Sequence, residues 1–221
     1  MFETKTLGVD NPVALQRLVF FYVSFYLCQK GKGNLRDLKV GDFVLNTEGG
    51  RKYYTLKYYE HQKNHPDRLP ENQPSPRLYE SPNDTRPCPV QAFELYCSKL
   101  HNRCPYLFQR PSPQWEPGCH TSEWYYCEPV GHNKLATMMR DISKAAGLSK
   151  PYTNHSVTVT AIKALDKAGF ESRVIMSLSG HRAEASVHRW KQGSRERPRE
   201  ACSDALGAAL GLLGSSVKTD D

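Results

Sequence analysis

The sequence lacks any hydrophobic run long enough to cross a lipid bilayer, which takes about 20 consecutive apolar residues. Its longest such run, LVFFYVSFYLC at residues 18–28, is too short and too aromatic, and no signal peptide precedes it. This run is therefore expected to form a helix of the protein core.

Cysteines paired at Cys-x2-4-Cys spacing, the usual mark of a structural zinc site, are also absent. The seven cysteines are odd in number and irregularly spaced, which favours reduced thiols in the cytosol or nucleus. We expect buried or idle thiols, with no metal ion and no cofactor. Zinc binding stays open as an alternative, through Cys104, Cys119, His120, Cys127 and His132.

Acidic residues are too few to balance the basic ones, and no internal repeat is present. The 221 residues include 30 Lys and Arg against 23 Asp and Glu, so the formal net charge is +7 and the pI is about 9.0. A basic chain of this kind attracts polyanions, among which nucleic acid comes first. The length suits one domain, with or without a tail.

Apolar periodicity and chain breakers predict the first elements. A helix begins at Pro12 and ends before KGKG at residues 30–33, and a short helical turn then leads into a strand over residues 40–45. A Gly-Gly turn and a tyrosine-rich strand follow. A brief strand near residues 77–79 and a helix at 90–101 come next.

Residues 103–130 are dense in proline, cysteine and aromatic residues and are expected to form a loop. Helices predominate after it, at residues 132–146, 156–168, 171–177 and 184–191, with Gly147, Gly169 and Gly180 at helix ends. This order predicts an α+β fold that is mainly helical and contains a small three-stranded antiparallel sheet.

The same pass suggests where the chain divides. We expect an N-terminal extension at residues 1–11 and one domain at 12–193, with 103–130 as an insertion in it. The closing residues 194–221 are rich in Gly, Ala and Leu and are expected to be a low-complexity tail.

Four basic side chains stand out by their positions. Arg36 follows the first long helix, Lys63 follows the second strand, His155 opens a helix, and His181 belongs to a Gly-His pair. Taken singly, each has an ordinary structural explanation as an ion-paired, solvated or helix-capping residue. Their order along the chain is what makes them a candidate site.

Together these segments resemble the catalytic domain of the tyrosine recombinases, the phage-integrase-like enzymes of DNA strand exchange. GNLRDLKVGDF is similar to the first arginine segment of that family, and KYYTLKYYEHQKNH to its lysine hairpin. NHSVTVTAIKALDKAGF is similar to its His-x-x-Arg helix, and LSGHRAEASVHRW to its Gly-His segment. The resemblance implies a DNA breaking-rejoining catalytic-core fold. It matches Arg36, Lys63 or Lys57, His155 and His181 to catalytic positions.

Residues 15–190 resemble more closely the recombinase-derived domain near the C-terminus of MYM-type zinc-finger proteins and glutamine-rich QRICH-type proteins, which descend from Crypton transposons. This resemblance implies a nuclear protein with a role in chromatin or transcription. The short basic stretch RERPR at residues 195–199 agrees with that placement.

Two positions depart from the recombinase pattern. Thr158 stands where the second arginine is expected, and Trp190, nine residues after His181, stands where the nucleophilic tyrosine is expected. Threonine lacks the charged fork that holds phosphate oxygens, and an indole N–H cannot attack phosphorus. Tyr152 is the last tyrosine of the chain, so no other tyrosine lies near the vacated position. We therefore predict a domain without catalytic activity.

The surviving basic side chains predict a face that contacts DNA phosphates without reading sequence. A merely solvated face is equally compatible with them. The recombinases clamp DNA with a separate helical domain, and the stretch before the first helix is too short to supply one. The predicted DNA-contacting residues are Arg36, Lys63, His155, His181, Arg182 and Arg189.

Three other functions stay open. The first is a pure protein-interaction scaffold that makes no DNA contact. A helix-turn-helix reader around Gly169 would have only Arg173 to read bases. An active enzyme that used Ser186 or His188 as nucleophile would still lack the arginine at position 158.

Overall fold

The computed structural model describes residues 1–28, 35–57, 75–81, 84–118 and 124–179. Within them the chain forms a group of helices packed on α1, a three-stranded antiparallel sheet at one side of that group, and a second, two-stranded sheet. The α+β class is confirmed, as is the small three-stranded sheet. The elements in chain order are α1 (Pro12–Tyr26), η1 (Val40–Asp42), β1 (Phe43–Glu48), β2 (Arg51–Leu56), β3 (Leu78–Tyr79), α3 (Pro89–Lys99), β4 (Gln109–Pro111), β5 (Tyr125–Pro129), α4 (His132–Ala145), α5 (Asn154–Lys167) and α6 (Ser172–Ser179).

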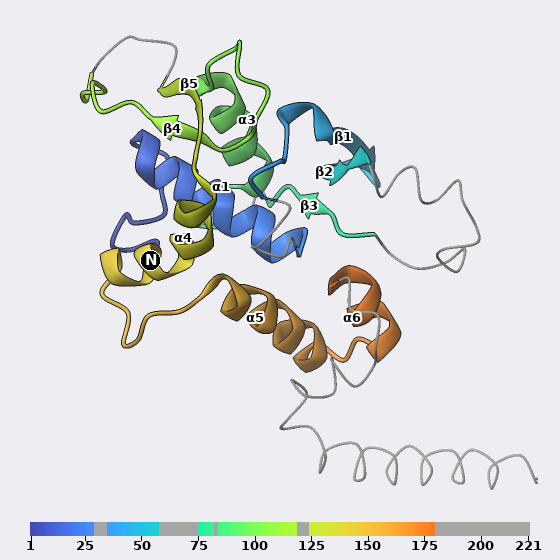
Figure 1. Cartoon of the computed structure of the whole chain (residues 1–221). Coiled ribbons are helices and arrows are strands. Elements are labelled where there is room, and N and C mark those ends of the chain that lie inside the picture. Colours follow the sequence, from blue (N-terminus) through green and yellow to red (C-terminus); the bar gives the residue numbers. More distant parts are fainter. Residues whose placement is uncertain (29–34, 58–74, 82–83, 119–123, 180–221) are drawn as a thin grey trace, which may run out of the picture.

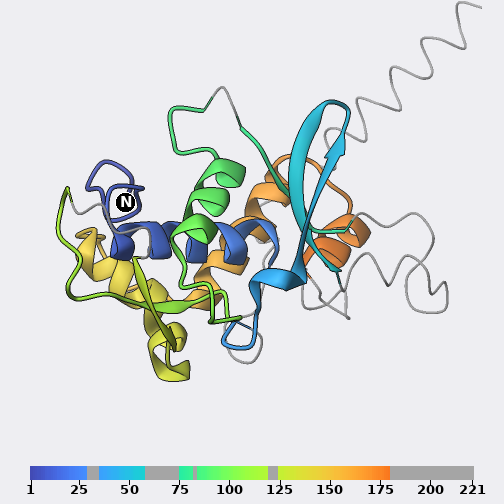
Figure 2. The same ribbon diagram turned by 90° about the horizontal axis from the view of Figure 1, so that it is seen from above.

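Helix α1 is the centre of the core. It starts where the sequence predicts, because the side chain of Asn11 accepts a hydrogen bond from the Ala14 amide at 2.9 Å and Pro12 occupies the first turn. Leu15, Leu18 and Phe20 are fully buried, as expected for a helix covered on several sides. Helices α3, α4 and α5 pack around α1, which runs through the middle of the molecule in both views (Figure 1 and Figure 2).

The three-stranded sheet has the order β1-β2-β3 and lies against α3. The predicted Gly-Gly turn joins β1 to β2, with φ of +56° at Gly49 and +78° at Gly50, values that glycine reaches without a Cβ clash. The Phe93 ring of α3 lies 4.8 Å from the ring of Phe43 and 4.6 Å from that of Tyr54. The sheet is thereby attached to the core through aromatic contacts.

The expectation of a plain loop at residues 103–130 is wrong in part, because β4 and β5 pair within it. The two strands are antiparallel, with Gln109 opposite Pro129 and Pro111 opposite Tyr125 across an irregular register. Phe108 and Tyr125 are buried in the main core. The strands are only 3 and 5 residues long and prolines end both, so their local sequence resembles that of a loop.

The helices of the C-terminal half agree with the prediction. Gly147 follows α4 with φ of +62°, and Gly169 follows α5 with φ of +84°. Both are left-handed positions that favour glycine at a helix C-terminus. Gly180, the helix expected at residues 184–191 and the tail at 194–221 lie outside the described residues.

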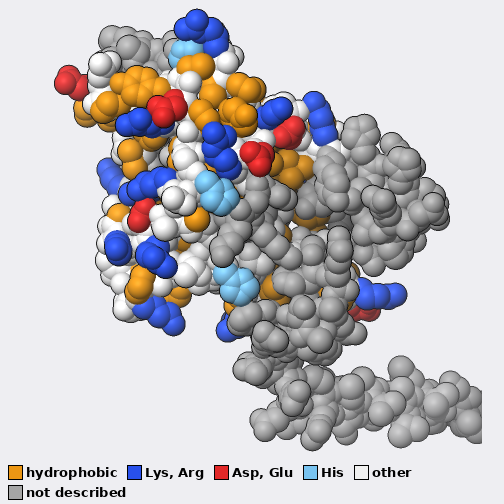
Figure 3. All heavy atoms as spheres, in the orientation of Figure 1, with side chains coloured by type: hydrophobic (Ala, Val, Ile, Leu, Met, Phe, Trp, Pro, Cys, Tyr) orange, Lys and Arg blue, Asp and Glu red, His pale blue; other side chains and the backbone are white. Residues whose placement is uncertain are grey.

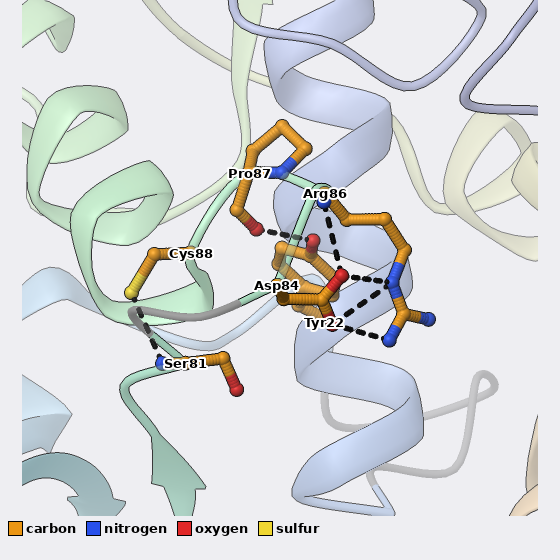
Figure 4. A network of polar contacts seen from close by, with 6 residues as sticks. All are labelled: Tyr22, Ser81, Asp84, Arg86, Pro87 and Cys88. Carbon is orange, nitrogen blue, oxygen red and sulfur yellow. Dashed lines mark hydrogen bonds and ion pairs between the residues drawn. The ribbon is translucent and has the colours of Figure 1, made fainter.

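A network of polar contacts fastens the segment that leads into α3 onto α1 (Figure 4). The hydroxyl of Tyr22 donates to the Pro87 carbonyl oxygen at 2.6 Å, and the Ser81 amide contacts the Cys88 sulfur at 3.4 Å. Arg86 and Asp84 form an ion pair in the same turn, in which Nε of Arg86 lies 2.9 Å from one carboxylate oxygen. Hydrogen bonds from Arg86 lower the pKa of Asp84 to about 2.

This ion pair predicts a dependence of stability on acid. The depressed pKa of Asp84 means that its contribution is complete above the ordinary aspartate value near 3.8 and disappears as the pH falls toward about 2. We expect Asp84→Asn to unfold at a lower temperature than the unaltered protein at pH 5, and the difference to shrink steadily between pH 4 and pH 2. Thermal unfolding followed by circular dichroism at each pH measures it. A difference that stays constant down to pH 2 would contradict the assignment.

Candidate nucleic-acid interface

Arg36 is the first of the predicted site residues, and it lies in the segment between α1 and η1. Its guanidinium stacks over the ring of Tyr106, with Cζ 4.8 Å from the ring centroid. Two backbone hydrogen bonds hold this segment against residues 105–107, from the Val40 amide to the Pro105 oxygen at 3.0 Å and from the Leu107 amide to the Leu38 oxygen at 2.7 Å. Arg36 is half-buried, and the Tyr106 ring on which its guanidinium stacks holds it in position.

The turn at residues 101–109, which carries Tyr106 and is called the Arg36 platform below, depends on Gln109. The Gln109 side chain is fully buried. Its Nε2 donates to the carbonyl oxygens of Cys104 and Tyr106, each at 3.1 Å, and its Oε1 accepts from the His101 amide at 2.8 Å. These bonds satisfy backbone groups of a turn that is otherwise irregular. Gln109 therefore determines where Tyr106, and with it Arg36, lies.

His155 lies in the first turn of α5 and is exposed. A capping box of Thr153 and Ser156 begins this helix. The side chain of Asn154 joins the turn to α4, since its Oδ1 accepts from the Met139 amide at 3.1 Å and its Nδ2 donates to the Leu135 oxygen at 2.8 Å. Asn154 is a positioning residue that the sequence reasoning missed, although an Asn at a helix start beside a candidate His was a usable signal.

Thr158, one turn further along α5, is buried with only 4% of its surface exposed. It shares the buried face of the helix with Val157, Ala161 and Ile162. The position at which the sequence resemblance predicts an arginine therefore holds a small neutral side chain that is packed into the interior.

Of the remaining predicted residues, the structure describes Lys57 but not the others. Lys57, the alternative hairpin lysine, directly follows β2 and is exposed. Arg36 packs against Tyr106, whereas the turn that carries His155 is fastened to α4. Five of the predicted residues lie outside the described residues, namely Lys63, His181, Arg182, Arg189 and Trp190.

A second basic and aromatic cluster, on β2 and β3, was missed by the sequence reasoning. The guanidinium of Arg51 lies over the Tyr79 ring at 5.1 Å, that of Arg77 lies over the Tyr53 ring at 4.4 Å, and the two rings are 4.9 Å apart. Arg51 and Tyr53 are two residues apart in β2, and Arg77, directly before β3, is two residues from Tyr79. This spacing places both side chains of each pair on one face of an extended segment. That spacing was visible in the sequence, but the pairing of the strands was not.

Basic side chains outnumber acidic ones on the face shown in Figure 3, where they lie among hydrophobic side chains. Such a surface gives a positive potential with apolar contact area between the charges. It is compatible with binding to a polyanion, and its charge is distributed rather than gathered at one point.

The described residues contain neither a cluster of metal-ligating side chains nor a helix that could span a membrane. Among the described residues, no three His, Cys, Asp or Glu side chains lie close enough to hold a metal ion. Cys104 is buried and Cys127 is exposed, while Cys119 and His120 belong to the undescribed segment. Within the described ranges, none of the helices combines the length and the apolar character that a bilayer crossing requires.

Residues 1–144 match a family model described as "Domain of unknown function (DUF3504)". The chain belongs to this family. The match includes Arg36 and the Arg36 platform. It ends within α4, before His155 and Thr158. No curated protein matches the sequence significantly.

Two solved structures are similar to the DUF3504 chain in fold. One is described as "Crystal structure of XerA recombinase", with 17% identity, a TM-score of 0.48, and coverage of 86% of this chain and 58% of that one. The other is described as "Crystal structure of XerH site-specific recombinase bound to difH substrate: pre-cleavage complex", with 15% identity, a TM-score of 0.48, and coverage of 91% and 50%. The chain therefore spans between half and three fifths of these recombinases. Likenesses of this size leave activity and substrate open.

Proposed function

We propose that this chain is a catalytically silent, domesticated recombinase-like domain that binds duplex DNA through phosphate contacts. Its further role is as an assembly module in chromatin or transcription, in the nucleus. The Crypton-derived domains of MYM-type zinc-finger and QRICH-type proteins, which its sequence resembles, are the model for this role. The observation that carries the proposal is the burial of Thr158 in place of a phosphate-holding arginine.

Cleavage of a phosphodiester by the recombinase route has three requirements. A nucleophile attacks phosphorus, cations hold the two non-bridging oxygens as charge develops, and an acid protonates the departing sugar oxygen. Arginine suits the second task because its planar fork binds two oxygens at once. The threonine hydroxyl at position 158 provides neither charge nor fork, and it is closed off from a substrate by its burial.

The nucleophile is missing as well, because Trp190 occupies the position at which the resemblance predicts the tyrosine. Loss of one electrostatic or nucleophilic group typically slows a reaction by about 10² to 10⁴-fold or more. Loss of both accounts for a domain that keeps the basic side chains of the family without turning over DNA. Arg36 and His155 then serve to attract phosphates instead of stabilising a transition state.

DNA binding predicts a strong dependence on salt. Neutralising about four phosphates gives a slope near −3.6 in log K against log salt, so we expect roughly a 10²-fold weaker Kd at 200 mM than at 50 mM NaCl. Fluorescence anisotropy with a labelled duplex of arbitrary sequence measures it. Arg36→Glu and Arg182→Glu should each weaken binding about tenfold at 100 mM NaCl, because each reverses the charge of a predicted DNA-contacting residue.

Arg173→Glu is the matched control, since Arg173 is an exposed arginine of α6 that is not among the predicted DNA-contacting residues. It should leave the Kd within about twofold. A large loss in this variant alone would favour the helix-turn-helix alternative. Absence of binding by the unaltered protein at 50 mM NaCl would instead favour the protein-interaction scaffold.

Catalytic silence is tested with a suicide duplex, nicked so that a cleaved strand cannot religate. We expect no covalent protein–DNA adduct on a denaturing gel, even with the protein in large excess, because no tyrosine occupies the position of the nucleophile. An adduct that disappears in a His155→Ala/His181→Ala double variant would overturn the proposed inactivity.

A further inference from the structure

A cavity of about 490 Å³ lies between the first half of α1, the start of α4 and the β4–β5 ladder. These elements adjoin one another at the side of the molecule that carries the N-terminus (Figure 1). Cavities of this size accommodate small organic ligands. It is separate from the Arg36 platform and from the β2–β3 cluster, and the proposed DNA contacts do not use it.

One part of the lining is apolar. Val13 of α1, Pro111 and Pro129 at the ends of the two strands, and Met138 of α4 all contribute to it. Val13 is 44% exposed, an unusual exposure for a valine next to the core, and it lies at the rim. A ligand with a hydrophobic body would cover this surface.

The other part of the lining carries an excess of positive charge. Arg110 pairs with Glu128 at 3.1 Å and Lys134 pairs with Asp141 at 2.8 Å, so two cations are matched by two carboxylates. Arg17 is the third cation, and in the described part of the chain it forms no ion pair. Burial lowers the pKa of Arg17 and nearby Asp141 opposes this, yet a guanidinium stays charged at neutral pH.

The start of α4 adds to the positive potential. Its N-cap is Gly131, which lines the cavity and has no side chain to accept from the free amides of the first turn. That turn also contains no acidic residue and does contain Lys134. A helix start without a capping side chain favours an anion beside it.

We propose that this cavity binds a small organic anion with an apolar body, its carboxylate held by Arg17 and the amides at the start of α4. The apolar body lies against Val13 and Met138. The carboxylates of Glu128 and Asp141 lie in the same cavity and repel a polyanion, so the site suits a single negative charge and not a nucleic acid backbone.

The test uses the full chain and two probes that share a body and differ in charge, 4-phenylbutyrate and 4-phenylbutylamine, with inorganic phosphate as a third. Isothermal titration calorimetry should show saturable binding of 4-phenylbutyrate and at least tenfold weaker binding of the other two. Arg17→Gln should weaken the 4-phenylbutyrate Kd at least tenfold, because a charge-assisted contact is lost. Arg103→Gln, at an exposed arginine outside the cavity, should leave it unchanged.

Two substitutions at Val13 should leave the fold intact, because this residue is partly exposed in the first turn of α1. Val13→Asp places a negative charge at the rim and should weaken 4-phenylbutyrate binding, while the same charge stabilises the helix start. Val13→Lys should strengthen it. The proposal is overturned if the amine binds as tightly as the carboxylate, if phosphate alone does so, if Arg17→Gln has no effect, or if no probe binds at millimolar concentration.

Discussion

Replacing Gln109 with leucine is expected to lower the free energy of unfolding by about 4 kcal/mol. The substitution keeps the side chain's approximate volume and removes the hydrogen bonds to the His101 amide and to the Cys104 and Tyr106 oxygens, of which the Cys104 bond is fully buried. Each buried backbone group that loses its partner costs about 1–3 kcal/mol. Urea denaturation followed by tryptophan fluorescence measures the change.

Gln114→Leu is the matched control, because Gln114 is an exposed glutamine of the same segment. Its effect should stay within about 0.5 kcal/mol. The Gln109 variant should also bind DNA more weakly where it is still folded, since the turn that carries Tyr106 under Arg36 is released. A loss of stability no larger than that of Gln114→Leu would show that the Gln109 bonds do not hold the turn.

Tyr96 supplies the second large effect, since its ring is fully buried between those of Tyr125 and Phe108, with centroids 5.1 Å and 6.5 Å away. Tyr96→Ala should cost about 4–5 kcal/mol, because it leaves a large cavity in the core. Tyr96→Phe keeps the ring and removes only the hydroxyl, which donates to the Leu107 oxygen at 2.9 Å, and should cost about 1 kcal/mol.

The comparison between the two Tyr96 variants separates packing from hydrogen bonding. Equal losses in both would mean that the hydroxyl, and not the ring, stabilises the junction of α3 with the 105–108 segment. Thermal unfolding provides a second readout, since about 2–4 °C accompanies each kcal/mol in a protein of this size. We expect Tyr96→Ala to melt at least 8 °C below the unaltered protein.

Elements with strong local signals could be predicted from the sequence. Helix α1 has a capping Asn11, a proline in its first turn and a continuous apolar period, and Gly147 and Gly169 mark the ends of α4 and α5. The Gly49–Gly50 turn likewise follows from backbone preference alone. In each case a few adjacent residues carry the information.

The contacts that build the site depend on partners far apart in the chain. Glutamine is usually a surface residue. Gln109 is buried because its side-chain amide hydrogen-bonds to backbone carbonyl groups of a neighbouring turn. Arg36 and Tyr106 are 70 positions apart, and β4 and β5 are too short to be recognised without each other. Sequence periodicity describes one element at a time, so it could name Arg36 and His155 as candidates without giving their surroundings.

The unit that folds is larger than the unit that the family model covers. The match to DUF3504 ends at residue 144, yet α5 packs along α1 and Val157 belongs to the main core. A polypeptide that ended at residue 144 would expose the hydrophobic face of α1 that α5 covers, and this exposed face would promote self-association. Laboratories that express members of this family therefore have reason to carry their fragments past α6 and to discount insolubility seen with shorter ones.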